Sequence, residues 1–263
     1  MFSKYEIYTS GTMEKEIIKR LNELEDHENV KILYAAESGS RAWGFASPDS
    51  DYDVRFIYLR SKEFYLKLEK TRDVIELPIN DILDINGWDL KKTLKLLHTS
   101  NPTLFEWSSS PIVYKSTPYF EDLKKVINGY FKAKSGLYHY LNMADGNYRK
   151  YLKGEYVKAK KYFYVLRPIL ACKWILKYNC PPPMLFSELV ESVLEPVIQL
   201  TVHDLLNIKM NTSEMGEVPK INDLNTYIEQ NLTSIKIEID SLPKEHLKDW
   251  DELNLLFYHA LEQ

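Results

Sequence analysis

Two aspartates one residue apart, Asp51 and Asp53, stand a short loop downstream of the small-residue turn Gly39-Ser40. Carboxylates at positions i and i+2 of a strand point to the same face of a sheet and can share a divalent metal ion. A glycine–serine turn between a strand and a helix is typical of a segment that holds phosphate. Phosphate binding beside a metal site, at this spacing, predicts transfer of a nucleotidyl or phosphoryl group.

The turn Gly39-Ser40 is expected to close a strand over 30–36 and to open a short helix over 41–45. Free N–H groups at the helix start would face an anion, and glycine would let the backbone approach a phosphate, with one more hydrogen bond from the Ser40 hydroxyl. Two alternatives stay open. The turn can be an ordinary connection with Ser40 as N-cap, and Arg41 can either reach a phosphate or face solvent.

The metal site is expected on a strand over 52–59, where Asp51, Asp53 and Arg55 share one face. Oxygen-only ligands suit magnesium or manganese. Magnesium in particular takes one or two carboxylates together with substrate phosphates and water. The sequence therefore predicts that Asp51 and Asp53 hold Mg²⁺ or Mn²⁺ against the phosphates of a nucleotide.

A third carboxylate is expected, because two-metal phosphoryl transfer generally uses one to hold the second ion and to accept the proton of the attacking hydroxyl. Asp84 and Asp89 compete for this role. Asp84 lies within the next strand pattern and could point at Asp51 and Asp53, whereas Asp89 stands where a helix begins and suits an N-cap. We favour Asp84 as catalytic residue and metal ligand and keep Asp89 as the alternative.

A long helical pattern over 155–178 is rich in cations and aromatic residues. Lys160, Tyr164 and Arg167 are spaced i, i+4 and i+7 and so share one helix face, with Lys161 next to it. Lysine and arginine suit phosphate and tyrosine can stack on a base, so these four residues are candidate nucleotide-binding residues. The alternative is a solvated basic face with the tyrosine packed in the core.

A loop expected after residue 207 carries Lys209 and Glu214. These two residues could belong to a lid over the site. The alternative is a plain surface loop with no function.

The composition excludes several classes of protein. With 44% apolar and 13% aromatic residues among 263, the chain can bury a full core. Its net charge of -4 gives no strong sign of binding to a long nucleic acid, which would need a basic excess. No apolar run is long enough to span a membrane, and the two cysteines fit a reducing, cytoplasmic setting.

The elements that position these residues divide into two kinds. Up to about residue 115, strand patterns alternate with short helices; beyond it, long helical patterns dominate. We therefore expect an α/β domain over 1–115 and an all-helical domain over 116–263. Further strands are expected over 74–77 and 82–86, and the long helices over 124–142, 155–178, 185–207, 219–235 and 249–261.

The run Gly39-Ser40-x-Ala42-x-Gly44, followed by Asp49-Ser50-Asp51-x-Asp53, resembles the nucleotidyltransferase signature of the DNA polymerase β superfamily, especially its minimal members. Within that superfamily, the segments 37–44 and 51–55 are similar to the RNA-ligase-associated branch, as are the later segments 88–92 and 101–107. Together these segments cover about residues 30–114. The helical part resembles the branch less specifically.

The resemblance implies an α+β fold: a small mixed-sheet nucleotidyltransferase domain with flanking helices, then an all-helical domain closing the cleft. It also implies that Gly39 and Ser40 hold a nucleoside triphosphate and that Asp51 and Asp53 bind magnesium, with a third carboxylate on a following strand. Glu106 is singled out by the resemblance alone.

The predicted reaction is metal-dependent transfer of a nucleoside monophosphate, from ATP or a similar triphosphate, to an acceptor hydroxyl with release of pyrophosphate. The acceptor stays open among a small molecule, a protein and an RNA end. Two other hypotheses are a nucleotide-binding regulatory protein without catalysis and a partner in an RNA-repair or toxin–antitoxin system.

Overall fold

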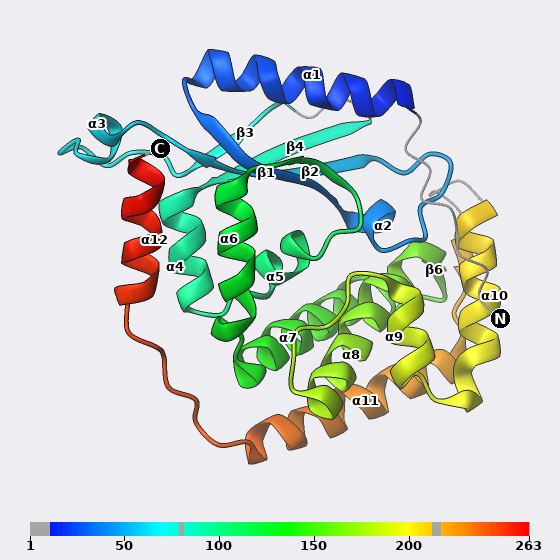
Figure 1. Cartoon of the computed structure of the whole chain (residues 1–263). Helices are drawn as coiled ribbons and strands as arrows, with labels where there is room; N and C mark the ends of the chain where they lie inside the picture. The colour runs from blue at the N-terminus through cyan, green and yellow to red at the C-terminus, as the bar shows by residue number, and fades with distance from the viewer. Residues whose placement is uncertain (1–10, 79–81, 212–216, 263) are drawn as a thin grey trace.

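The computed structural model describes residues 11–78, 82–211 and 217–262. A five-stranded mixed sheet with the strand order β3-β4-β2-β1-β5 lies at its upper side (Figure 1). In the described part of this sheet β2 and β4 pair in parallel, and the other neighbouring strands pair antiparallel. The strands are β1 (Lys31–Ser38), β2 (Tyr52–Leu59), β3 (Val74–Glu76), β4 (Leu83–Asp89) and β5 (Val113–Ser116).

The register of the sheet brings the predicted acids to one edge. Asp53 of β2 pairs with Asp84 of β4 on one side and with Ser38 of β1 on the other. Burial alternates along the first half of β2, so Val54 is buried while Asp53 and Arg55 are partly exposed. Because the Gly39 turn follows β1 directly, the turn and the acids Asp53 and Asp84 meet where β1 ends and β2 and β4 begin.

Helices cover both faces of the sheet (Figure 1). On one face lies α1 (Gly11–Glu28), whose residues Ile17, Leu21 and Leu24 repeat at helical spacing and are buried against the strands. A second hydrophobic cluster on the other face takes side chains from α4 (Leu90–His98), α5 (Pro102–Ser108), α6 (Pro118–Ile127) and α12 (Asp251–Leu261).

Local sequence explains where three of these helices begin. Asp89, Asn101 and Thr117 precede α4, α5 and α6, and each side chain accepts a backbone N–H of the first turn. Pro102 and Pro118 follow at the first helical position, where the missing N–H of proline costs no hydrogen bond. The N-cap expected at Asp89 is confirmed.

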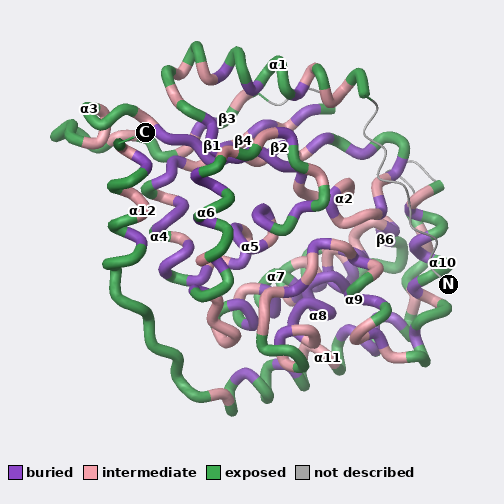
Figure 2. The backbone as a smooth tube through the Cα atoms, viewed as in Figure 1, coloured by how far each residue is buried: buried purple, intermediate pink, exposed green. Residues whose placement is uncertain are grey.

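A second helical group packs below the sheet around its own hydrophobic cluster. Its most deeply buried long helix is α8 (Ala159–Tyr178), which is buried over most of its middle (Figure 2). Phe45, from the loop after the short helix α2 (Gly39–Ala42), inserts into this cluster and so links it to the predicted phosphate turn. The group comprises α7 (Ala133–Tyr151), α8 (Ala159–Tyr178), α9 (Phe186–Val193), α10 (Pro196–Asn211), α11 (Asn222–Ser241) and the pair β6 (Tyr156–Lys158) and β7 (Glu217–Pro219).

The predicted α+β class, with a small mixed sheet and a helical part after it, is confirmed. Two long helices were predicted wrongly as single elements. The pattern over 124–142 is interrupted by a 3-10 turn at Asn128–Tyr130, and that over 185–207 is divided before Pro196, which lacks the N–H needed to continue a helix. The helix expected from 155 begins at Ala159, because the preceding residues form β6.

The division into domains near residue 115 stays a prediction. Beyond that position, α6 and α12 supply Phe120, Leu123 and Leu253 to the cluster that covers the sheet. Within the described ranges, no helix is both long and apolar enough to cross a membrane.

Candidate active site

The Gly39 turn and Asp53 are in direct contact. Gly39 has a φ of +60°, a conformation that residues with a side chain rarely adopt. A Cβ atom at this position would overlap Asp53 Oδ2, so the carboxylate occupies the space that any other residue would need. Ser40 lies inside α2, whose N-cap is Ser38, so the alternative that Ser40 caps this helix is wrong.

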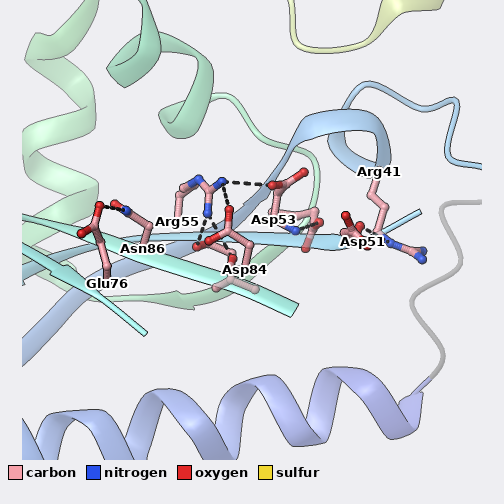
Figure 3. A network of polar contacts seen from close by, with 9 residues as sticks. Arg41, Asp51, Asp53, Arg55, Glu76, Asp84 and Asn86 are labelled. Carbon is pink, nitrogen blue, oxygen red and sulfur yellow. Dashed lines mark hydrogen bonds and ion pairs between the residues drawn. The ribbon is translucent and has the colours of Figure 1, made fainter. Parts of the chain in front are cut away.

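Asp53 and Asp84 share one arginine (Figure 3). Arg55 Nη2 donates to Asp53 Oδ1 at 3.0 Å and to Asp84 Oδ2 at 2.7 Å, while its Nη1 donates to the carbonyl of Asp84 at 3.1 Å. The three side chains are partly buried, with 18–31% of their surface exposed. The guanidinium therefore neutralises two carboxylates that would otherwise repel each other across adjacent strands.

Asp51 precedes β2 and is exposed. Its backbone is held by Arg41, whose Nε donates to the Asp51 carbonyl at 3.0 Å and whose Nη2 donates to the Ser50 carbonyl at 2.6 Å. The guanidinium also stacks on the ring of Tyr52, 3.7 Å from its centroid (Figure 3 shows Arg41 beside Asp51). Arg41 thus fixes the loop that leads into the aspartates.

Asp89 lies at the far end of β4, five residues or about 17 Å from Asp84 along the strand. It is 3% exposed and accepts the Lys91 N–H at 2.7 Å and the Tyr65 hydroxyl at 2.8 Å. Burial raises its pKa above the usual range, although both hydrogen bonds oppose this. Of the two competing acids, the structure places Asp84 beside Asp53 and gives Asp89 to a helix cap.

Glu37 is a functional candidate that the sequence reasoning missed. Only 1% of it is exposed, at the end of the apolar strand β1. Its Oε1 accepts the backbone N–H of Asp53 at 2.8 Å, and its Oε2 accepts a short hydrogen bond from the Tyr114 hydroxyl. Burial raises the pKa of Glu37 to about 7. The sequence signal for this candidate is that Glu37 is an acid near the end of an apolar strand, just before the Gly39 turn.

The helix face expected to contact the nucleotide begins near α2. The Lys161 ammonium lies 4.1 Å from the Tyr151 ring centroid and 4.5 Å from that of Tyr164. Tyr164 in turn packs edge-on against Trp43, the C-cap of α2, with centroids 6.2 Å apart. Lys160 is partly buried on the same first turn of α8. These side chains therefore neighbour the short helix that follows the predicted phosphate turn.

Arg167 lies deeper than its neighbours on this face. It is 2% exposed, its Nη1 donates to Glu106 Oε1 at 2.7 Å, and its guanidinium lies 4.6 Å from the Trp43 ring centroid. Glu106 also accepts the Tyr140 hydroxyl at 2.7 Å. Arg167 and Glu106 therefore join α8 to α5, and the alternative of a solvated basic face does not describe Arg167.

Lys209 does not lie in a loop, as the sequence suggested. It belongs to the last turn of α10, is 4% exposed, and donates to Ser47 Oγ at 2.8 Å and to Ser50 Oγ at 3.4 Å. The helical part thereby holds the loop between α2 and Asp51. Glu214, the other residue of the expected lid, lies outside the described residues.

The candidate metal ligands do not by themselves enclose an ion. Among the residues that the structure describes, no three acidic, histidine or cysteine side chains form a set able to enclose a metal ion. Asp53 and Asp84 contact Arg55 instead. Adjacent carboxylates still fit magnesium, since this ion binds through one or two carboxylates while substrate phosphates and water complete its coordination.

Comparison with known proteins agrees with the motif. Residues 13–259 match the RNA repair pathway DNA polymerase beta family. The chain belongs to this family. It is 47% identical over 253 residues to the uncharacterized protein YcgL of Bacillus subtilis strain 168. The alignment covers 95% of this chain and 97% of that protein. The resemblance to the DNA polymerase β superfamily is thus confirmed.

A solved structure was also found, that of a nucleotidyltransferase-like protein from Exiguobacterium sibiricum 255-15. The superposition covers 87% of this chain and 75% of that protein's chain, with 14% sequence identity and a TM-score of 0.32.

Proposed function

We propose that this protein is a metal-dependent nucleotidyltransferase that moves a nucleoside monophosphate from a triphosphate, ATP first among those to test, to an acceptor hydroxyl. The observation that carries the proposal is the contact between Gly39 and Asp53, with Asp84 next to Asp53 in the sheet. A phosphate-holding turn and two carboxylates within one small volume suit this chemistry. Membership of a DNA polymerase β-type family supports the same reaction.

In this proposal Gly39 and Ser40 hold the triphosphate, and Asp51, Asp53 and Asp84 are the ligands for Mg²⁺ or Mn²⁺. The bound ion would supply neutralisation of the phosphate charge. Arg55 contacts Asp53 Oδ1 and Asp84 Oδ2, so its positive charge would oppose a metal ion bound at the same two carboxylates.

The transfer itself needs position and charge more than covalent chemistry. The acceptor oxygen forms a bond to the α-phosphorus, the bond from that phosphorus to the oxygen bridging toward the β-phosphate breaks, and pyrophosphate leaves. We assign the proton of the acceptor hydroxyl to Asp84, whose carboxylate is the proposed base. Glu37 and Arg41 would keep Asp53 and Asp51 in place through the backbone.

On the helical side, Lys160, Lys161 and Tyr164 are the proposed contacts to the nucleotide. Lys161 and Tyr164 already stack together next to Trp43. Arg167 would reach a phosphate only by leaving Glu106, so we assign it to hold α8 against α5. We place the protein in the cytoplasm, in keeping with its free cysteines and a nucleotide substrate.

The test is pyrophosphate release from each of the four ribonucleoside triphosphates with Mg²⁺ or Mn²⁺. Wild type and Asp51→Asn/Asp53→Asn are compared in the presence of RNA, protein extract or metabolites. Release that disappears in the double variant supports transfer, and the pool that stimulates release indicates the acceptor. Magnesium-dependent nucleotide affinity without any release would favour a regulatory nucleotide-binding protein instead.

A further inference from the structure

A line of alternating rings and cations leads away from α2 across the helical part. Trp43 contacts Tyr164, Tyr164 contacts the Lys161 ammonium, and Lys161 contacts the Tyr151 ring. Lys150 continues the line, 5.0 Å from the centroid of the same Tyr151 ring. These residues come from three segments: the end of α2, then α8, and the last turn of α7.

The cations on this line lie close enough to repel one another. Desolvation lowers the pKa of Lys161, and the positive charges of Lys160, Lys158 and Lys150 lower it further. Lys150 and Lys158 make no ion pair with any residue in the described ranges, and Lys158 lies opposite Glu217 in the β6–β7 pair without forming one. Two cations without an ion pair among the described residues, Lys150 of α7 and Lys158 of β6, favour a polyanion, although the whole chain is acidic.

One exposed and one partly exposed aromatic ring accompany these lysines. Tyr156, at the start of β6, is 68% exposed, and Tyr151 lies under both Lys150 and Lys161. Single-stranded nucleic acids are bound by this combination, with lysine on phosphates and aromatic rings stacked on bases. A free triphosphate would need the cations but would not need rings spread over α7 and β6.

We propose that Lys150, Tyr151, Tyr156 and Lys158, which we call the lysine–tyrosine track, bind a single-stranded polynucleotide. It rests on the proposed function in one respect: the strand is the acceptor, and its end would meet the nucleotide near Trp43. No continuous basic run in the sequence predicts this track, because Lys150 lies in α7 and Lys158 in β6, and both lie within electrostatic range of Lys161 in the folded chain.

The experiment measures binding of a short fluorescent single-stranded RNA to the full chain by anisotropy, without metal or nucleotide, over a range of KCl concentrations. Lys150→Gln/Lys158→Gln is compared with Lys70→Gln/Lys236→Gln, which removes the same charge from exposed positions elsewhere. Each lost phosphate contact lowers the slope of log affinity against log salt by ~0.7, so the track variant should lose about 1.4. The control should keep the wild-type slope.

Further measurements distinguish RNA binding from nucleotide binding, and the track from the proposed catalytic function. Tyr156→Ser should weaken RNA binding about tenfold while Tyr156→Phe keeps it, because stacking needs only the ring. Calorimetry with Mg²⁺ and ATP should give the same affinity for Lys150→Gln/Lys158→Gln as for wild type. Asp51→Asn/Asp53→Asn should still bind RNA, so a failure of catalysis leaves the track standing.

Three results would overturn the track: no salt-dependent RNA binding by wild type, equal salt slopes for the track variant and its control, or an ATP affinity that falls with the track lysines as much as RNA affinity does. The last result would assign these cations to the nucleotide substrate.

Discussion

The two ends of β4 carry the same residue type in opposite surroundings. Asp84 lies at the sheet edge, 30% exposed, next to Asp53 and an arginine. Asp89 is buried and receives two hydrogen bonds, from a backbone N–H and a tyrosine hydroxyl. In the proposed function the first carboxylate takes up an incoming ligand, whereas the second is buried and its partners are supplied by the fold. Residue type alone did not separate them, but neighbours and exposure do.

The largest expected effect follows from replacing the acid at the sheet edge. Asp84→Asn should lower the rate of pyrophosphate release by about 10²- to 10⁴-fold, the range for loss of a positioned base, and by more if metal is lost too. Asp89→Asn should leave the rate of the folded protein within about twofold of wild type, since Asp89 lies about 17 Å away along the strand. Equal losses in both variants would break the comparison of the two ends.

Arg55 offers a test of partner exchange that does not depend on activity. Its guanidinium and a metal ion compete for Asp53 and Asp84, and two charges 4 Å apart in water interact by about 1 kcal/mol. Arg55→Gln should therefore bind Mn²⁺ about fivefold more tightly in the absence of nucleotide. Calorimetry or electron paramagnetic resonance with Mn²⁺ alone measures this affinity. Weaker binding would mean that Arg55 orients the carboxylates instead of competing with the ion.

Glu37 tests whether the backbone beneath Asp53 matters. Glu37→Leu leaves the Asp53 N–H and the Tyr114 hydroxyl buried without their acceptor, which should lower the free energy of unfolding by about 1–3 kcal/mol for each group. Glu37→Gln keeps an acceptor oxygen of similar shape and should recover most of the stability. Urea unfolding of both variants, together with pyrophosphate release, separates loss of the fold from loss of the Asp53 position.

What could be predicted from the sequence depended on local spacing. The Gly39 turn and Asp53 are close along the chain, and period-two alternation placed Arg55 on the face of Asp53. Asp84 followed from one more strand pattern. Contacts over long separations were missed: Lys209 reaches Ser47 across 162 positions. No periodicity encodes such a pair, because packing of separate helices decides it.

Asp89 gives the smallest effects and completes the comparison. Asp89→Ala removes the N-cap of α4 and should lower the free energy of unfolding by about 1 kcal/mol, measured by urea denaturation. The pH dependence has a definite sign. Because burial raises the pKa of Asp89 above 3.8, the folded protein keeps this proton to higher pH than the unfolded chain does. The contribution of Asp89 to stability therefore falls as the pH rises from 3.8 through the raised pKa.

Asp89→Asn carries no titrating proton and should flatten this part of the stability profile while keeping an oxygen for the Lys91 N–H. The matched control is Asp84→Asn, which keeps Asp89 in place, so the fall should persist in this variant. A fall that persists in Asp89→Asn would locate the titrating group elsewhere. If the fall disappears only in Asp89→Asn, the contrast between a buried cap and an exchangeable edge carboxylate is supported by a measurement that needs neither metal nor substrate.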